Sequence, residues 1–283
     1  MSWAGRLLAV LECALNRGPE PWRRAAGCGT VLVLAACAAV PAFAAERWGG
    51  PVVAAVLMAS LPAQRSLWTH VRAVARALGQ GVPQARAAVA HIVGRDTAAL
   101  DGSGVACAAI ESVAESFSDG VVGPALWAAL CGLPGIATFK AVSTADSTVG
   151  HRTARYRAFG WASARLDDVL NLPAARLSAL LIAAAALLNR DDAVGALRAA
   201  WRDAGKHQSP NAGWPEAAMA GALGLRLGGP RSYGGAAEGG AWLGDGRSAA
   251  DGRDLRRALR LYRTACVLHW LCYAALLLAA ARL

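Results

Sequence analysis

The sequence has little of what marks a soluble enzyme, a zinc protein or a disulfide-stabilised domain. Charged residues make up only 17% of its 283 residues, and the mean hydropathy is +0.34. Its seven cysteines include no Cys-x-x-Cys pair and no Cys/His pairing at metal-ligand spacing. They lie mostly inside apolar runs, so we interpret them as small core residues rather than as disulfide partners or zinc ligands.

Lysine is nearly absent. It occurs only at Lys140 and Lys206, so the net charge of +10 comes almost wholly from arginine. The arginines flank apolar segments without a nucleic-acid recognition motif, which argues against a DNA- or RNA-binding protein. Such a basic protein is expected to meet anionic lipid headgroups or an anionic substrate. The G-x-x-x-x-G-K-[ST] loop, the dinucleotide glycine fingerprint and the G-x-S-x-G elbow are also missing, so single motifs name no reaction.

Long apolar runs are what the sequence does have. They predict an all-α, polytopic integral membrane protein with three to five apolar helices and polar cytoplasmic loops. Residues 25–45 and 48–63 are two runs in close succession and predict a helical hairpin. Residues 265–281 predict a further span at the C-terminus. We therefore expect a single membrane-integrated domain over residues 1–283.

The first apolar run has an alternative interpretation as an export signal. Arg23 and Arg24 precede it, and Ala42-Phe43-Ala44 has the small-residue pattern of a cleavage site. A twin-arginine signal would be removed from the mature protein. The second apolar run follows at once, which favours the membrane hairpin.

Two shorter apolar stretches, 120–139 and 173–188, contain prolines or glycines and are compatible with spans, re-entrant segments or buried helices. A full crossing at 120–139 would put the basic segment 140–172 outside the cell, against the positive-inside rule. We therefore favour a non-crossing or re-entrant pair. An odd number of crossings then keeps 190–264 in the cytoplasm and the C-terminus outside, in a bacterial inner membrane.

A row of carboxylates is expected on one helix. The pattern from Gly104 to Phe117 favours a helix, and Glu111, Glu115 and Asp119 recur every four residues, so they would share one face. Like charges at this spacing repel unless a cation neutralises them. Mg²⁺ is the natural candidate, although a solvated acidic face paired with arginines is the simpler alternative.

The segment 139–152 follows an apolar stretch and concentrates ionisable side chains. Lys140 and Arg152 are suited to holding a phosphate or a carboxylate, and Asp146 lies between them. His151 is a possible proton carrier, but a single histidine is more often an ordinary polar contact.

Two carboxylates follow Arg165 at Asp167 and Asp168. They predict either another cation site or the N-cap of a helix that begins at residue 169.

A third polar cluster, over residues 203–216, is dense in glycine, proline and polar side chains. A turn explains part of this composition, and ligand binding would explain the rest. Trp214 is expected either to stack on a flat ligand or to anchor at the membrane interface. Further on, the glycine-rich stretch 228–253 predicts a loop that is either a linker or a lid over a bound ligand.

The polar clusters form an ordered series of motifs: Gly94-Arg95-Asp96-Thr97, Glu111-Ser-Val-Ala-Glu115-Ser, Lys140-Ala-Val-Ser-Thr-Ala-Asp146-Ser, Arg155-Tyr156-Arg157-Ala-Phe-Gly160-Trp161, Arg165-Leu-Asp167-Asp168 and Lys206-His207-Gln-Ser209-Pro210-Asn211-Ala-Gly-Trp214-Pro215-Glu216. From about Gly5 to the C-terminus, this series closely resembles adenosylcobinamide-phosphate synthase, the CobD/CbiB family of cobalamin biosynthesis.

The resemblance implies an integral membrane enzyme that joins the propionate carboxyl of adenosylcobyric acid to aminopropanol or its phosphate. Amide-bond formation of this kind is expected to use ATP and Mg²⁺, because a carboxylate is a poor electrophile until it is activated. Further expected partners are membrane lipid and other late cobalamin enzymes. A transporter or corrinoid-binding protein that leaves the corrinoid unchanged, or a scaffold for other enzymes, is the alternative.

On this basis each polar residue receives a role. The residues assigned to catalysis are Lys140, Asp146, Arg152 and His207. Those assigned to substrate binding are His151, Arg155, Arg165, Lys206, Ser209, Asn211, Trp214 and Glu216, and those assigned to the metal ion are Glu111, Glu115 and Asp119. Family members usually begin with a further apolar segment that carries Gly-Asp-Pro and His-Pro, so we expect either a late start codon or a member that dispenses with this segment.

Overall fold

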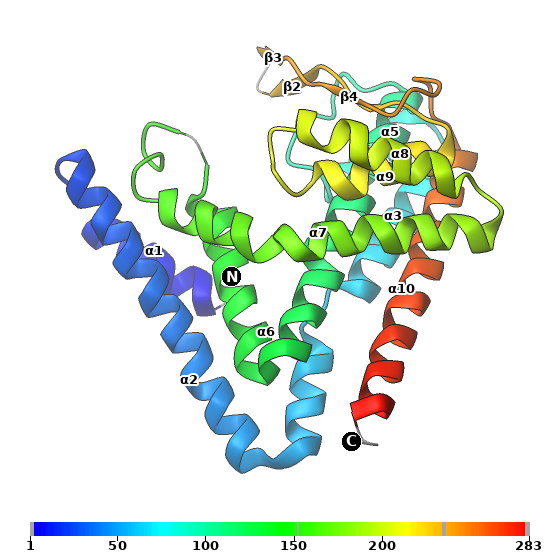
Figure 1. Cartoon of the computed structure of the whole chain (residues 1–283). Coiled ribbons are helices and arrows are strands. Elements are labelled where there is room, and N and C mark those ends of the chain that lie inside the picture. The colour runs from blue at the N-terminus through cyan, green and yellow to red at the C-terminus, as the bar shows by residue number, and fades with distance from the viewer. Residues whose placement is uncertain (1–2, 152, 234–235, 281–283) are drawn as a thin grey trace. The chain divides into compact units, whose positions relative to one another are not determined.

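A computed structural model describes residues 3–151, 153–233 and 236–280, which are mostly helical (Figure 1). In the described part of the chain, four helical stretches are long and apolar enough to cross a membrane. They are Glu20–Ala77, Gly102–Val149, Trp161–Asn189 and Gly252–Ala279. The prediction of an all-α, polytopic membrane protein is therefore confirmed.

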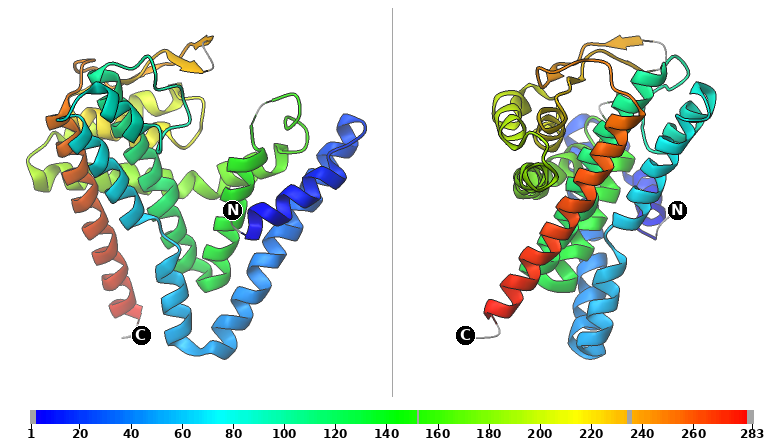
Figure 2. Two further views of the ribbon diagram at one scale, coloured as in Figure 1. Left: turned by 180° about the vertical axis from the view of Figure 1, so that it is seen from behind. Right: turned by 90° about the vertical axis from the view of Figure 1, so that its right-hand side faces the viewer.

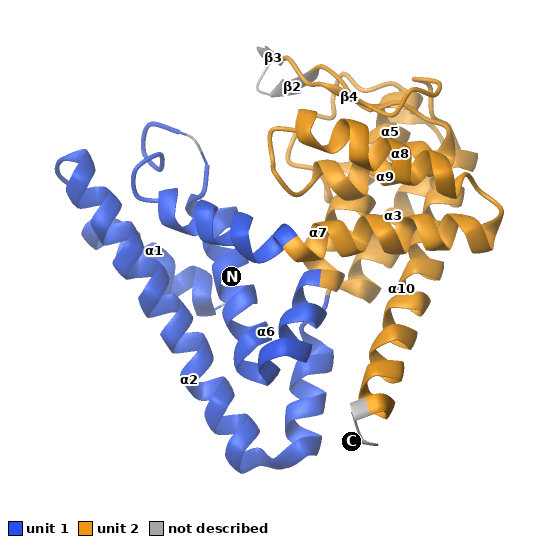
Figure 3. Cartoon of the chain, in the orientation of Figure 1, with its two compact units in different colours: residues 1–62, 123–172 blue, residues 63–122, 173–283 orange. Residues whose placement is uncertain are grey.

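The chain divides into two compact units, each built from two separate stretches of sequence (Figure 3). Unit 1 contains Met1–Pro62 and Gly123–Leu172, and unit 2 contains Ala63–Val122 and Pro173–Leu283. Neither unit is a continuous piece of the chain. The expectation of one membrane-integrated domain stays a prediction.

Unit 1 begins with α1 (Trp3–Leu15) and α2 (Glu20–Ser60). The helical geometry of α2 breaks at Gly50, where φ is 78° and ψ is 173°. The chain turns back at this end of α2, so that the two apolar runs form the arms of a hairpin (Figures 1 and 2). Glycine suits this position because a positive φ is disfavoured for residues with a Cβ atom.

A second reversal lies inside α6 (Gly123–Val149). Backbone angles leave the helical region at Cys131 and at Gly132, where φ is 63°. The arms on either side pack closely, because a Cβ atom added at Gly123 would lie 2.6 Å from Cζ of Phe139. A segment that turns back has the geometry required of a re-entrant segment, and the entry of 120–139 into a bilayer stays a prediction.

Helix α7 (Trp161–Asn189) contributes to both units. Because it begins at Trp161, Asp167 and Asp168 lie inside the helix, and the prediction that they cap a helix starting at residue 169 is wrong. Within unit 2, the part of α7 after Pro173 crosses α10 (Gly252–Ala280) at a steep angle (Figures 1 and 2). The two helices cannot both follow the normal of one flat bilayer.

In unit 2, α9 (Gly213–Leu223) is buried on nearly every side, as expected of a core helix that is apolar all round. It packs against α5 (Gly102–Phe117), α8 (Ala193–Asp203), the 3₁₀ turn η2 (Ala204–Lys206) and α10. Helices α3 (Gln64–Ala77) and α4 (Val82–Val89) pack against α5, which continues into the π-helical turn η1 (Ser118–Val122).

The glycine-rich stretch contains two short antiparallel ladders. Strand β1 (Leu227–Gly228) pairs with β4 (Trp242–Leu243), so that Leu227 lies opposite Leu243. Strand β2 (Arg231–Tyr233) pairs with β3 (Ala236–Glu238). The composition had predicted only a loop here, and the β1–β4 ladder holds the start of this stretch beside Trp242 and Leu243.

Candidate functional site

A small polar cavity in unit 2 brings together charged residues that are far apart in the sequence. Glu111 and Glu115 of α5, Glu216 of α9 and Arg95 of the α4–α5 loop all line it. The cavity has a volume of about 110 Å³. Three of these four residues are among those assigned a role from the sequence, and Glu216 joins the carboxylates of α5 from a helix about a hundred residues away.

Local interactions explain why the cavity lies where it does. Asp101 caps α5, because its carboxylate accepts a hydrogen bond of 2.7 Å from the Gly104 amide. The two glutamates then follow one turn apart, so that both point to the same side. Ser112 donates a 2.8 Å hydrogen bond to the carbonyl of Ile92 and so fastens the α4–α5 loop to the helix.

Glu111 is buried, and its charge is compensated from two sides. Arg95 lies 3.1 Å from Oε2, and the amide of Gly228 donates a 2.8 Å hydrogen bond to Oε1. A buried carboxylate requires such partners, because its desolvation is costly. The contact also ties strand β1, at the start of the glycine-rich stretch, to the cavity.

Glu216 is only 1% exposed and has His207 beside it, with 3.7 Å between Nε2 and Oε1. Nδ1 of His207 accepts a 3.0 Å hydrogen bond from the amide of Ser209. In a neutral imidazole the proton therefore belongs on Nε2, the nitrogen that faces the glutamate. Ser209 also accepts from the amides of Asn211 and Ala212, at 3.2 Å each, which shapes the turn before α9.

Trp214 has a cation rather than open space over one face. Arg176 of α7 lies 4.8 Å from its ring centroid and also donates a 3.2 Å hydrogen bond to Oδ1 of Asn211. Trp201 meets the same ring edge to face, at 6.1 Å between centroids. Trp214 is therefore already packed against Arg176 and Trp201. Its roles in stacking on a flat ligand or anchoring at the membrane interface stay predictions.

Lys206 is engaged with a buried carboxylate at the end of α8. Asp203 is 1% exposed and accepts from Lys206 at 2.7 Å, from Arg202 at 2.8 and 2.6 Å, and from the Gly244 amide at 2.8 Å. The Arg202 contact, with Lys206 and the amide in support, holds the pKa of Asp203 well below its usual range. This cluster fixes the loop that carries His207.

Asp119 lies in the π-helical turn, half-buried, and it is not among the residues that line the cavity. The predicted row of carboxylates ends with α5 at Phe117, because the backbone no longer follows the 3.6-residue period beyond it. Across residues 3–151, 153–233 and 236–280, no group of three or more His, Cys, Asp or Glu side chains is arranged to hold a metal ion.

The remaining predicted residues belong to unit 1. Lys140 lines a separate cavity of about 480 Å³ whose other walls are largely apolar. Asp146 is half-buried on the same helix, and His151 is exposed in the following loop. Arg152 lies outside the described residues.

Two arginines of unit 1 already have carboxylate partners. Arg155 makes a bidentate contact with Glu12, at 2.8 Å for both nitrogens. This contact lowers the pKa of Glu12 despite its burial. Arg165 lies 3.5 Å from Asp168 one turn further along α7, with its side chain mostly exposed.

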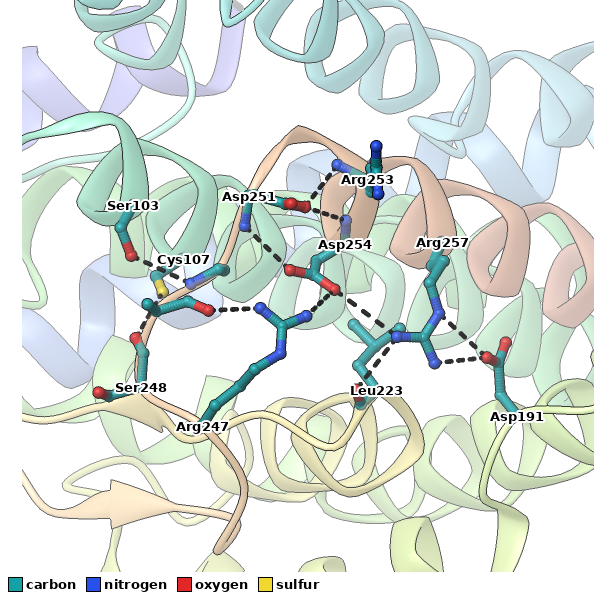
Figure 4. A network of polar contacts seen from close by, with 12 residues as sticks. Ser103, Cys107, Asp191, Leu223, Arg247, Ser248, Asp251, Arg253, Asp254 and Arg257 are labelled. Atoms are coloured by element: carbon teal, nitrogen blue, oxygen red, sulfur yellow. Dashed lines mark hydrogen bonds and ion pairs between the residues drawn. The ribbon is translucent and has the colours of Figure 1, made fainter.

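A polar network joins α10 to the two helices that line the cavity, α5 and α9 (Figure 4). Arg257 of α10 contacts Asp191 at 2.7 Å and donates a 3.2 Å hydrogen bond to the carbonyl of Leu223, at the end of α9. Arg247 pairs with Asp254 of α10, and Ser103 of α5 accepts a 3.0 Å hydrogen bond from the Ala250 amide. Helices α5, α9 and α10 are thus joined by polar contacts on the side where the glycine-rich stretch ends.

Comparison with known proteins agrees with the motif series. The family described as CobD/Cbib protein matches residues 1–262. The cobalamin biosynthesis protein CobD of Sinorhizobium fredii is 48% identical over 273 residues, which cover 93% of this chain and 84% of that protein. The CobD of Rhizobium meliloti is 46% identical and covers 96% and 86%, and that of Rhodobacter capsulatus is 47% identical and covers 94% and 85%. No solved structure matches.

The chain belongs to the CobD/CbiB family. As a family member it takes part in cobalamin biosynthesis, and its four long apolar helices make it a membrane protein. Its substrates are therefore expected among corrinoids and the small molecules attached to them.

The sequence had given no role to three residues that line the cavity or hold the segment 203–216 beside it. Arg95 lies in the Gly94-Arg95-Asp96-Thr97 motif, and Asp203 opens the third polar cluster, so both were near residues already singled out. Arg176 lies within the apolar stretch 173–188, which was considered only as a possible membrane segment. A charged residue inside such a stretch is itself informative, because its burial must be compensated.

Proposed function

We propose that this protein joins a propionate carboxyl of adenosylcobyric acid to the amine of aminopropanol or its phosphate, at the expense of ATP. The carboxyl is first activated as an acyl phosphate or an adenylate. The amine nitrogen then attacks the carbonyl carbon, the C–N bond forms, and the C–O bond to phosphorus breaks. One former carboxylate oxygen leaves with the phosphate, and the nitrogen loses a proton.

The observation that carries this proposal is the cavity lined by Arg95, Glu111, Glu115 and Glu216. Its volume of about 110 Å³ is small beside the roughly 300–1,000 Å³ of pockets for drug-sized ligands. It is large enough for a phosphate or carboxylate group and too small for a corrin ring. We infer that the reacting end of the substrate enters, while the macrocycle stays outside.

The donor set suits a hard cation. Carboxylate oxygens are what Mg²⁺ prefers, and this ion is usually held by one or two carboxylates together with substrate phosphates rather than by a complete protein cage. The absence of a preassembled cluster among the described side chains is compatible with that mode. Glu115 and Glu216 are the proposed ligands, because both line the cavity, from helices α5 and α9. Bound Mg²⁺ would neutralise charge on the nucleotide phosphates.

The protein's own groups have defined tasks in this proposal. Arg95 lies at the cavity wall and is suited to the negative charge of a phosphate or of the activated carboxyl. His207 faces Glu216 with the nitrogen that carries its proton, 3.7 Å from Oε1. The amine loses its ammonium proton to solvent before it attacks, and a second proton leaves the nitrogen for solvent as the amide forms. Asn211 and Arg176 position the turn before α9.

The residues of unit 1 keep their predicted roles as proposals. Lys140 and Arg152 are proposed to bind phosphate or the activated carboxyl, with Asp146 nearby on α6. Lys140 lines a largely apolar cavity of about 480 Å³, which is large enough for part of an organic substrate.

We also propose that the protein spans the bacterial inner membrane with its polar loops in the cytoplasm. In a variant whose seven cysteines are replaced by serine, Thr153→Cys tests the loop between α6 and α7, because Thr153 is exposed. A membrane-impermeant maleimide should label it only in inside-out vesicles. Labelling from the periplasmic side in intact spheroplasts would contradict the re-entrant arrangement.

Product formation is the direct test of the reaction. Detergent-purified full-length protein is incubated with adenosylcobyric acid, aminopropanol phosphate, ATP and Mg²⁺. The mass of the corrinoid is then measured by mass spectrometry. We expect a product heavier by the amine minus one water, lost when ATP is omitted and reduced about a hundredfold or more in Glu115→Gln. The matched control is Glu20→Gln, because the Glu20 side chain is 50% exposed in unit 1. An unchanged corrinoid that stays bound would favour the binding or transport alternative.

A further inference from the structure

A second charged site lies in unit 2, in a groove between α3 and α10. Its lining includes Arg72 and Arg76 of α3, and Arg256, Arg260 and Arg263 of α10, with Trp68 beside them. The volume of the groove is about 540 Å³. All five arginines are exposed, and the lining contains no carboxylate. Five cations without a counterion in the lining attract an anion.

The helical period explains how these arginines face one groove. Arg256, Arg260 and Arg263 are spaced by four and three residues, so they lie on one face of α10, and Arg72 and Arg76 are one turn apart on α3. The two helices are held side by side at Gln64, whose carbonyl accepts from Tyr262 at 2.9 Å. Ion pairs join other parts of unit 2, but in the described part of the chain none of the five groove arginines takes part in one.

The same face of α10 changes from basic to apolar along its length. Continuing from Arg263 by steps of four and three residues leads to Val267, which is 54% exposed, and to Trp270, which is 42% exposed. Leu271 and Leu278 extend this exposed apolar surface towards the C-terminus. Trp270 donates a 2.7 Å hydrogen bond from its indole to Gln64, as an aromatic residue does at a membrane interface. We call this exposed apolar surface of α10 the apolar stripe. The groove and the apolar stripe together match an amphiphilic molecule, with a phosphate group in the groove and hydrocarbon chains along the stripe.

We infer that this groove is a binding site for an anionic membrane phospholipid, with its headgroup phosphate among the arginines and its acyl chains along the apolar face of α10. A free phosphate compound would use only the arginine end and would leave the apolar stripe bare. Basic pockets between transmembrane helices on the cytoplasmic side are places where anionic headgroups bind. The inference does not rest on the proposed reaction.

Native mass spectrometry of the full-length protein in detergent tests this site. The probes are tetraoleoyl cardiolipin and dioleoylphosphatidylglycerol, with dioleoylphosphatidylcholine as the uncharged comparison and pyrophosphate as the free-phosphate competitor. The variant Arg256→Gln/Arg260→Gln should weaken binding of the anionic lipids by about tenfold or more, since two of the five cations that face the headgroup phosphate are lost. The control Arg198→Gln/Arg253→Gln removes the same charge from two exposed residues outside the groove and should change the affinity less than about twofold.

Equal weakening by both double variants would overturn the inference, because it would show attraction to net charge alone. Displacement of the lipid by equimolar pyrophosphate would overturn it in favour of a free phosphate ligand. A second measurement uses only the wild-type protein: phosphatidylglycerol with a photoreactive acyl chain should crosslink to residues 264–278. Crosslinks confined to α1 and α2 would contradict the site even if the double variant did not fold.

Discussion

Unit 1 and unit 2 use their polar residues differently. The described core clusters of unit 1 are small and apolar, with Leu8 and Leu34 in one and Ile136 in another. In unit 2, buried carboxylates such as Asp203 and Glu111 are paired with arginine and with backbone amides, and they join separate elements. Unit 1 has one comparable buried carboxylate among the described residues, Glu12, which pairs with Arg155. Unit 2 has more of them and also brings three carboxylates together at one cavity, as a catalytic site requires.

The largest expected effect is on activity and comes from unit 2. Glu216→Gln removes the buried charge beside His207 while keeping the side-chain shape. We expect the rate of amidated corrinoid formation to fall by about a hundredfold or more, because a fixed charge in a water-poor site is removed. Liquid chromatography with mass detection gives the rate, and Glu20→Gln is the control. A rate within threefold of the wild-type rate would contradict the proposed role of Glu216 in the reaction.

The next effect is on the stability of unit 2. Asp203→Asn should lower the free energy of unfolding by about 2 kcal/mol, because hydrogen bonds of a charged acceptor are lost. Denaturant unfolding in detergent, followed by circular dichroism, measures this change. Asp192→Asn is unsuitable as a control because Asp192 caps α8, so Asp96→Asn, at an exposed loop position, serves instead.

The same carboxylate predicts a pH dependence. The pKa of Asp203 is lower in the folded protein than the value of about 3.9 in an unfolded chain. Its contribution to stability is therefore complete above about pH 4 and is lost as the pH falls towards the folded-state pKa. The gap in stability between the wild type and Asp203→Asn should narrow below pH 4. A gap that stays constant down to pH 2.5 would contradict the ionised buried pair.

A smaller effect is expected at the reversal in unit 1. Gly132 has a φ of 63°, and an added Cβ atom would lie 2.5 Å from Oε1 of Glu46. Gly132→Ala should therefore cost about 1–2 kcal/mol, measured by unfolding in detergent. Gly29→Ala is the matched control, because beyond its chain neighbours and its own helix backbone no atom lies within 4 Å of the added Cβ, and it should be neutral or slightly stabilising. An equal change in the free energy of unfolding at both positions would argue against the chain reversal at Gly132.

The smallest effect concerns an exposed pair in unit 1. Arg165 and Asp168 are 3.5 Å apart, and the arginine side chain is 62% exposed. Arg165→Gln should change the free energy of unfolding by less than about 0.5 kcal/mol, because water and salt screen such pairs. If activity falls at the same time without a change in stability, Arg165 keeps its predicted role in substrate binding.

Periodicity was enough to predict part of the site. Glu111 and Glu115 were expected on one face of a helix over 104–117, and both line the same cavity from α5, which spans Gly102–Phe117. The apolar runs likewise predicted the membrane helices, since length and composition decide whether a segment can cross a bilayer.

Long-range packing was beyond such reasoning. The approach of Glu216 to the carboxylates of α5 depends on how α9 packs, which one sequence does not encode in a local pattern. Asp119 was grouped with them because a constant helical period was assumed, and the π-helical turn breaks that period at Ser118. The cap predicted at Asp167 failed because α7 starts earlier, at Trp161, and continues through Pro173.

The most direct test follows oxygen through the reaction. Adenosylcobyric acid labelled with ¹⁸O in its free carboxylate is incubated with the wild-type protein, the amine, ATP and Mg²⁺, and the phosphorus products are analysed by mass spectrometry. We predict one ¹⁸O in inorganic phosphate, or in AMP if the intermediate is an adenylate, for each amide formed, and about a hundredfold less transfer in Glu216→Gln. Amide formation with the ¹⁸O released only to water, or no amide at all in the wild type, would contradict an ATP-dependent ligase at this cavity.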